Sequence, residues 1–162
     1  MESYRLESEY PVPARRLFDL LRSPACQEAL ALVRGAQEVS AQALEQRGAV
    51  RPLELELSLP GWDVLGRPRG AERVVEHQDW DADGLAGRWV RHFRERGQAV
   101  VWEGEWQLHV LGPEACRLVE VGQIEIRTPL VGRKVERAAL AELQARHPRV
   151  VDLLLRQLGA LE

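Results

Sequence analysis

TPLVGRKVERAALAELQARHPRVVDLLLRQLG, residues 128–159, is the stretch that decides the fold, because its apolar residues recur at the spacing of one helical face. We expect one long amphipathic helix from Thr128, a good N-cap, to Gly159, with Pro129 at the first helical position. Strand-like segments precede this helix along the chain. The expected place of such a terminal helix is across the concave face of an antiparallel sheet. A sheet and a helix arranged in this way would enclose an interior space.

Strands and two short helices account for the rest of the chain. The first predicted strand, 4–10, ends at the PVP of residues 11–13, and two helices follow it up to Arg34, separated by Ser23-Pro24. Six further strands are predicted at 36–46, 50–59, 72–80, 85–95, 98–110 and 116–127, with a long Gly- and Pro-rich loop at 60–70. This order predicts a single α+β domain, residues 1–162, whose curved antiparallel sheet of six or seven strands wraps around the C-terminal helix.

The composition is that of an ordinary globular protein, and it argues against a nucleic-acid-binding, secreted or membrane-spanning protein. At 162 residues the chain fits one domain with a sizeable core. The formal net charge is −3 and no basic run is present, so no nucleic-acid partner is expected, although 21 of the 22 basic residues are Arg. The sequence has no signal-peptide pattern and no transmembrane segment, which predicts a cytoplasmic location. Cys26 and Cys116 are isolated and are expected to be buried or idle thiols.

The register of one hairpin can be predicted from its residues. If Arg96-Gly97 forms a two-residue turn, Trp89 lies opposite Gly104 and Arg91 opposite Trp102 on the inner face. Large side chains then meet glycines, and the outer face brings opposite charges together, which supports this register. The same register pairs Phe93 with Val100, Gly87 with Trp106 and, on the outer face, Arg88 with Glu105.

The next hairpin extends the pattern to a third strand. A turn at residues 112–114 places Gly104 beside Gly122, beneath Trp89. It also pairs Trp102 with Ile124 and Trp106 with Glu120. Two adjacent glycines leave room on the inner face for a pocket, or they allow the sheet to bend, and the two interpretations are compatible.

Charged residues on the inner face are the second signal. With residues 81–84 as a loop, Trp80 pairs with Leu85, and Glu76 then points inward beside Arg91. A buried charge needs a partner, so Arg91 could pair with Glu76 or with Glu120, and it could also lie on Trp102. Such a group is either a polar anchor for the head of a ligand that rests on tryptophans, or a structural salt bridge at the rim of the sheet.

Trp62 and His147 each allow two interpretations. Trp62 lies in the segment 60–70, where it could be a lid or a membrane-touching tip, or a plug packed onto the domain. His147 falls on the buried face of the last helix, immediately before Pro148. It could act as a general base or a ligand contact, or its ring could satisfy a carbonyl freed by a kink at the proline. The candidate ligand-binding residues are Glu76, Trp89, Arg91, Phe93, Trp102, Gly104, Trp106, Glu120 and His147.

Two stretches resemble a known superfamily. EYPVPARRLFDLLRSPA, residues 9–25, resembles the strand-to-helix opening of the START-like (SRPBCC) helix-grip superfamily, which includes polyketide cyclases, birch-pollen-allergen proteins and lipid-transfer domains. IEIRTPLVGRKVER, residues 124–137, looks like the closing passage of one uncharacterised bacterial branch. The resemblance covers the whole chain and implies a cavity for an apolar or amphipathic small molecule. Pro148 departs from it, because it is expected to interrupt a helix that is usually continuous.

No catalytic, nucleotide-binding or metal-binding motif is present, and the four histidines have no metal-ligand spacing, so no cofactor or metal is expected. The leading interpretation is a non-enzymatic binder or carrier of a small hydrophobic or amphipathic molecule. The alternatives are a cyclase- or isomerase-like enzyme that uses the same cavity, and a protein-interaction module with a filled core.

Overall fold

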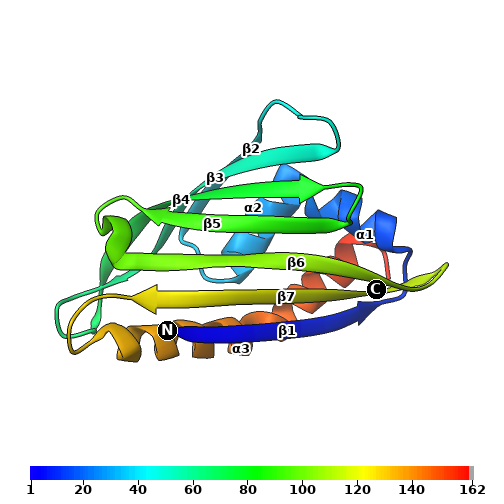
Figure 1. Cartoon of the computed structure of the whole chain (residues 1–162). Coiled ribbons are helices and arrows are strands. Elements are labelled where there is room, and N and C mark those ends of the chain that lie inside the picture. The colour runs from blue at the N-terminus through cyan, green and yellow to red at the C-terminus, as the bar shows by residue number, and fades with distance from the viewer. Residues whose placement is uncertain (161–162) are drawn as a thin grey trace.

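A computed structural model of the chain describes residues 1–160. Its elements are β1 (Glu2–Tyr10), α1 (Ala14–Leu21), α2 (Pro24–Val33), β2 (Glu38–Ala43), β3 (Val50–Trp62), β4 (Pro68–Asp81), β5 (Ala86–Phe93), a 3-10 turn (Gly97–Ala99), β6 (Val100–Gly112), β7 (Ala115–Ile126) and α3 (Gly132–Gln157). All seven strands join one antiparallel sheet in the order β1-β7-β6-β5-β4-β3-β2 (Figure 1). This confirms the predicted α+β helix-grip architecture.

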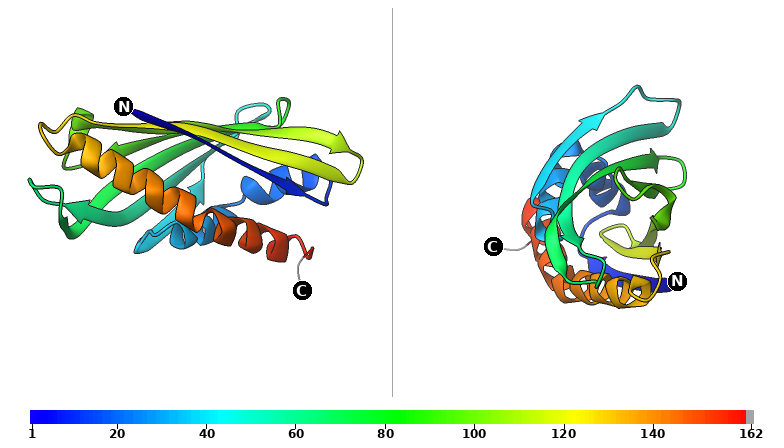
Figure 2. Two further views of the ribbon diagram at one scale, coloured as in Figure 1. Left: turned by 90° about the horizontal axis from the view of Figure 1, so that it is seen from below. Right: turned by 90° about the vertical axis from the view of Figure 1, so that its left-hand side faces the viewer.

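The sheet curves around the interior, and the helices close its concave side (Figure 2, right). α3 packs on β1 and β7, at one edge of the sheet, whereas α2 packs on β2 and β3 at the other edge. The two helices also contact each other, which joins the two sheet edges. The interior is therefore enclosed by the sheet on one side and by α2 and α3 on the other. None of the helices in residues 1–160 is both long and apolar enough to cross a membrane.

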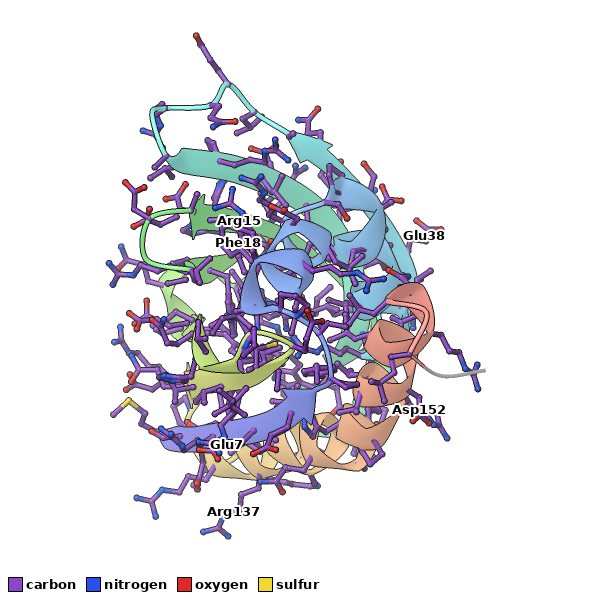
Figure 3. All side chains as sticks on the ribbon, turned by 90° about the vertical axis from the view of Figure 1, so that its right-hand side faces the viewer. Glu7, Arg15, Phe18, Glu38, Arg137 and Asp152 are labelled. Atoms are coloured by element: carbon purple, nitrogen blue, oxygen red, sulfur yellow. The ribbon has the colours of Figure 1, made fainter. Side chains whose placement is uncertain are left out.

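One end of this interior is tightly packed. Leu17 and Phe18 of α1 are fully buried, and Figure 3 shows Phe18 directed inward while Glu7 and Asp152 point to solvent. The Phe18 ring meets the Trp80 ring edge-on at 5.9 Å, and Trp80 stacks on Trp106 at 4.7 Å. These aromatic contacts form a solid core beneath α1.

Most of the predicted inner-face register is confirmed. Trp89 pairs with Gly104, Arg91 pairs with Trp102, and Gly104 lies beside Gly122. The predicted two-residue turn at Arg96-Gly97 is wrong, because a 3-10 turn occupies residues 97–99.

The Arg96 side chain gives a physical reason for this turn. Its Nε donates to Glu72 Oε1 at 2.7 Å and its Nη2 donates to the Trp62 carbonyl at 2.7 Å. Both partners belong to the β3–β4 hairpin, which is distant in sequence. Tertiary contacts of this kind override local turn preference, so the turn type could not be read from the dipeptide alone.

The predicted long loop at 60–70 is also wrong. β3 continues to Trp62 and β4 begins at Pro68, so the two strands extend as a hairpin with a register shift between Pro60 and Trp62. Asp63 closes the turn, since its Oδ1 accepts from the amides of Leu65 and Arg67, each at 2.9 Å. Bulges and turns are the places in a sheet that tolerate Pro and Gly, which explains why these residues suggested a loop.

The predicted partner of Trp80 also needs correction. Trp80 pairs with Gly87 and not with Leu85, which lies in the turn with φ +49°. The error is two residues, so the residues of β4 keep their predicted faces and Glu76 still points inward, opposite Arg91.

α3 differs from its prediction at its start and at Pro148. The helix begins at Gly132, because residues 129–131 form a turn in which Leu130 has φ +71°. It then continues unbroken to Gln157 with Pro148 inside it, so the expected interruption does not occur. The long C-terminal helix itself is confirmed.

Candidate functional site

A cavity of about 290 Å³ lies between the concave face of the sheet and α3. The extended β3–β4 hairpin forms one part of its boundary, through Pro60, Trp62 and Gly66. Its apolar lining consists of Leu57, Leu59, Phe93, Val100, Trp102, Ile124, Ile126, Val135, Ala139 and Leu143. Its charged lining residues are Arg34, Arg91, Glu142 and Arg146. An apolar space with a few converging polar groups is the usual form of a small-molecule site.

Arg91 is held firmly at the edge of this cavity. Its Nε donates to Glu76 Oε2 at 2.7 Å, and the exposed fractions of the two side chains are 12% and 6%. The guanidinium also lies 4.4 Å above the Trp102 ring and 5.3 Å above the Trp89 ring. Arg91 therefore forms a structural ion pair and also lines the cavity, and its role as an anchor for a ligand stays a prediction.

Glu76 is in turn fixed by a chain of amide side chains. Gln78 Nε2 donates to Glu76 Oε1 at 2.5 Å and to Gln27 Oε1 at 3.0 Å, and Gln27 Nε2 donates to the Leu21 carbonyl at 2.6 Å. Trp80 Nε1 completes the chain by donating to Gln78 Oε1 at 2.9 Å. These hydrogen bonds connect the sheet to α2 and orient the carboxylate toward Arg91.

Arg34, at the C-terminal end of α2, supplies a second guanidinium to the cavity. Its Nη1 lies 3.0 Å from Glu120 Oε1, which also accepts from Trp106 Nε1. Burial, the largest single influence, lowers the pKa of Arg34, but the combined effects of Glu120, Tyr4 and Glu76 raise this pKa above its usual value. Arg34 is therefore a permanent cation at the boundary between the cavity and the packed core.

Tyr4 lies within reach of these charges. Its ring covers Gly122, where an added Cβ would lie 2.5 Å from Tyr4 Cζ. Burial is the main cause that raises the pKa of Tyr4 above its ordinary value, and the nearby Glu120 carboxylate adds to it. The Arg34 guanidinium acts in the opposite direction.

The sequence interpretation missed Arg34 and Tyr4, for different reasons. Arg34 ends a helix, where a solvated arginine is common, and its partner Glu120 lies far away in sequence. Tyr4 shares the inward-facing alternation of the first strand with ordinary core residues. No local signal distinguishes either residue.

The room expected above the two glycines is filled. An added Cβ at Gly104 would lie 2.6 Å from Trp89 Cζ2 and 2.6 Å from the Val121 carbonyl. The expectation of open space at Gly104 and Gly122 is therefore wrong, because the Trp89 and Tyr4 rings occupy it. Of the predicted site residues, Arg91, Phe93 and Trp102 line the cavity, whereas Trp89, Gly104, Trp106, Glu76 and Glu120 lie in the packed wall beside it.

His147 and Trp62 can now be placed. His147 directly follows Arg146 on α3, and neither of its buried ring nitrogens has a hydrogen-bond partner within residues 1–160. The idea that this ring satisfies a carbonyl freed at Pro148 is therefore wrong. Trp62 packs on Phe93 at 6.3 Å beneath the Arg96 guanidinium, so it plugs and lines the cavity. Within the described residues, no cluster of three or more His, Cys, Asp or Glu is arranged to hold a metal ion.

A second hollow, of about 660 Å³, crosses the outer face of the sheet. It is the larger of the two, but it is more open and is lined largely by polar side chains. Some of these are already paired with each other, since Arg88 lies 3.3 Å from Glu105 and Gln123 donates to Glu103 at 2.7 Å. The inner cavity is the better candidate, because it is apolar and more enclosed.

Solved structures share this fold. A Thermus thermophilus protein, TTHA0849, aligns over 98% of both chains with 20% identity and a TM-score of 0.67. The Zhui aromatase/cyclase of Streptomyces sp. R1128 aligns over 96% of this chain and 92% of that chain, with 14% identity and a TM-score of 0.64. A START superfamily protein from Mycobacterium smegmatis covers 96% and 98% of the two chains, with 13% identity and a TM-score of 0.61. The chain thus has the START-like helix-grip fold.

Sequence comparison identifies the family of the chain. No curated protein sequence matches the chain significantly. Residues 5–149 match the profile of a family described as protein of unknown function (DUF2505). Because the match spans most of the chain, the protein belongs to the DUF2505 family, in agreement with the uncharacterised branch that the closing motif predicts.

Proposed function

We propose that this protein binds one small apolar or amphipathic molecule in the cavity between the sheet and α3. The observation that carries the proposal is an apolar space of about 290 Å³ bordered by two fixed arginines, Arg34 and Arg91. Ligand pockets in proteins span about 300–1,000 Å³, so the space suits a small molecule. The likeness to an aromatase/cyclase and to a START superfamily protein supports a cavity that receives a ligand.

The lining supplies hydrogen-bond donors that lack acceptors. Arg34 Nε, Trp62 Nε1 and Trp102 Nε1 are buried and have no partner within residues 1–160. Glu142, a carboxylate of the lining, is bound to Arg146 at 2.9 Å. An unpaired buried donor costs about 1–3 kcal/mol, and a ligand oxygen would remove that cost. The ligand therefore carries a carbonyl or carboxylate group beside its apolar body.

The geometry favours binding over the cyclase- or isomerase-like alternative. Both carboxylate oxygens of Glu76 accept hydrogen bonds within the protein, Oε1 from Gln78 and Oε2 from Arg91. Glu120 lies behind Arg34, in contact with Trp106. These carboxylates serve to position the arginines, and a proton carrier would instead have to face the substrate.

Decanoate and decanol test the proposal, because they share an apolar chain and differ in the acceptor group. The variant is Arg91→Met with Glu76→Gln, which removes the guanidinium without leaving a buried carboxylate unpaired. Losing one or two charge-assisted hydrogen bonds, at about 1.5–3 kcal/mol each, should lower the affinity for decanoate roughly ten- to more than a hundredfold. The affinity for decanol should change much less. Isothermal titration calorimetry measures both affinities.

Arg88→Met is the matched control. Arg88 lies on β5 like Arg91, but it faces outward and is 78% exposed, so its replacement should leave both affinities unchanged. Trp102 lines the cavity, and its fluorescence should change on ligand entry. If the wild type binds neither compound, the proposal fails. Equal decanoate binding by the wild type and the double variant would rule out Arg91 as the anchor.

A further inference from the structure

Three apolar side chains protrude from one end of the molecule. Val64 and Leu65, at the tip of the β3–β4 hairpin, are 83% and 56% exposed, and Leu130, between β7 and α3, is fully exposed. Isolated exposed apolar residues are normal on a protein surface. Here the three gather on two neighbouring turns, which calls for an explanation.

The backbone at Leu130 strengthens this observation. Its φ of +71° lies in the left-handed region, which is unfavourable for a bulky residue other than glycine. The side chain gains no compensating contact, because it projects fully into solvent. Folding alone therefore does not account for a leucine at this position, and strain of this kind often marks a functional site.

The two turns lie against each other beside the cavity. Lys134 Nζ is 3.5 Å from the Leu65 carbonyl, and a Cβ at Gly66 would lie 3.4 Å from Val131 Cβ. Gly66 and Val135 also line the cavity. Figures 1 and 2 show the β3–β4 turn and the β7–α3 turn at the same end of the molecule.

Positive charge surrounds the protruding side chains. Residues 61–70 and 127–134 contain five cations, which are Arg67, Arg69, Arg127, Arg133 and Lys134. They contain one carboxylate, Asp63, which is bound to Arg67 at 2.9 Å. These two segments therefore carry a net charge of +4, or +3 once Glu125, which lies 3.4 Å from Arg127, is counted, whereas the whole chain carries −3.

We propose that this end of the molecule, formed by residues 61–70 and 127–134, docks on a membrane surface that contains anionic lipids. Apolar side chains that project from tips insert between lipid headgroups, and surrounding cations are attracted to a negative surface. A protein partner would instead be matched by a recessed groove or a flat face. Docking in this orientation brings the end of the cavity lined by Gly66 and Val135 toward the bilayer. The proposal rests on surface residues, and its test needs no ligand in the cavity.

Vesicle flotation tests the docking with the whole chain, using phosphatidylcholine vesicles with and without phosphatidylglycerol. The wild type should float with the anionic vesicles and not with phosphatidylcholine alone. A triple variant, Val64→Ser, Leu65→Ser and Leu130→Asn, should lose this binding, and Asn suits the left-handed backbone at position 130. Replacing Arg133 and Lys134 by Gln should weaken binding roughly ten- to thirtyfold.

The matched control changes equally apolar residues at the other end of the molecule. Val110 and Leu111, at the β6–β7 turn, are 66% and 45% exposed, and their replacement by Ser should leave flotation unchanged. Absence of wild-type flotation, or flotation of the triple variant like the wild type, would overturn the proposal. So would a vesicle-free dimer that the triple variant abolishes, because these residues would then join two copies of the chain. Decanoate binding, measured separately, should survive in the triple variant, so a failed cavity and a failed surface are distinguishable.

Discussion

Arg91 and Trp102 could be assigned to one face from the sequence because alternation in a strand fixes which side chains share a face. The pairing of large side chains with glycines gave the register that the structure confirms. The same reasoning could not tell open space from filled space at Gly104, since ring orientation depends on neighbours from other strands. Arg34 and Tyr4 lie near Glu120 through tertiary contacts that no local sequence pattern encodes.

The two tyrosines allow a direct test of packing at the scale of single residues. Tyr4 and Tyr10 are the only tyrosines of the chain, both are buried, and burial raises the pKa of each. In the folded protein, near-ultraviolet absorbance should show no phenolate step near pH 10, whereas in denaturant both should titrate at about pH 10.

The sign of the stability change follows from proton binding. Above the unfolded pKa of about 10, the unfolded chain has lost tyrosine protons that the folded chain retains. The free energy of unfolding should therefore be unaffected by these groups below that pH and should fall above it, by about 1.4 kcal/mol per pH unit for each tyrosine. A phenolate step near pH 10 under native conditions would show that a tyrosine is exposed.

The strands and helices could be predicted better than the residues at which they begin and end. The succession of strands along the chain and the long last helix follow from periodicity, which extends over many residues. The β3–β4 hairpin was predicted as a loop because Pro60 and its glycines fit equally well at a bulge and a turn. The start of α3 shifted to Gly132 because Leu130 adopts a left-handed conformation that leucine rarely adopts.

Pro148 provides a test at the scale of one element. Proline inside a helix removes a backbone hydrogen bond and crowds the preceding turn, yet α3 continues from Gly132 to Gln157. Pro148 is exposed, so Pro148→Ala should raise the free energy of unfolding by about 1–3 kcal/mol, measured by urea denaturation.

Ligand binding is the control for this variant. The α3 residues that line the cavity, Val135 to Arg146, precede the proline, so decanoate affinity should not change. Unchanged or lower stability in Pro148→Ala would mean that the proline is accommodated without cost in this helix.

At the scale of the whole molecule, the interior has a packed end and a hollow end. Trp80 and Trp106 fill the space under α1, whereas α3 and the β3–β4 hairpin enclose a cavity bordered by Arg34 and Arg91. The apolar tips and their cations lie beside the hollow end, where Gly66 and Val135 line the cavity. Occupation of this cavity by a small molecule is the function that we propose.

Native mass spectrometry measures this occupancy, after incubation of the protein with a bacterial lipid extract and removal of unbound material. Ala139 lines the cavity, so Ala139→Trp should fill it, while Ala141→Trp on the exposed side of the same helix is the matched control. We expect one retained small molecule per chain in the wild type and in Ala141→Trp, and much less in Ala139→Trp. A bare wild-type chain, or equal retention by Ala139→Trp, would contradict it.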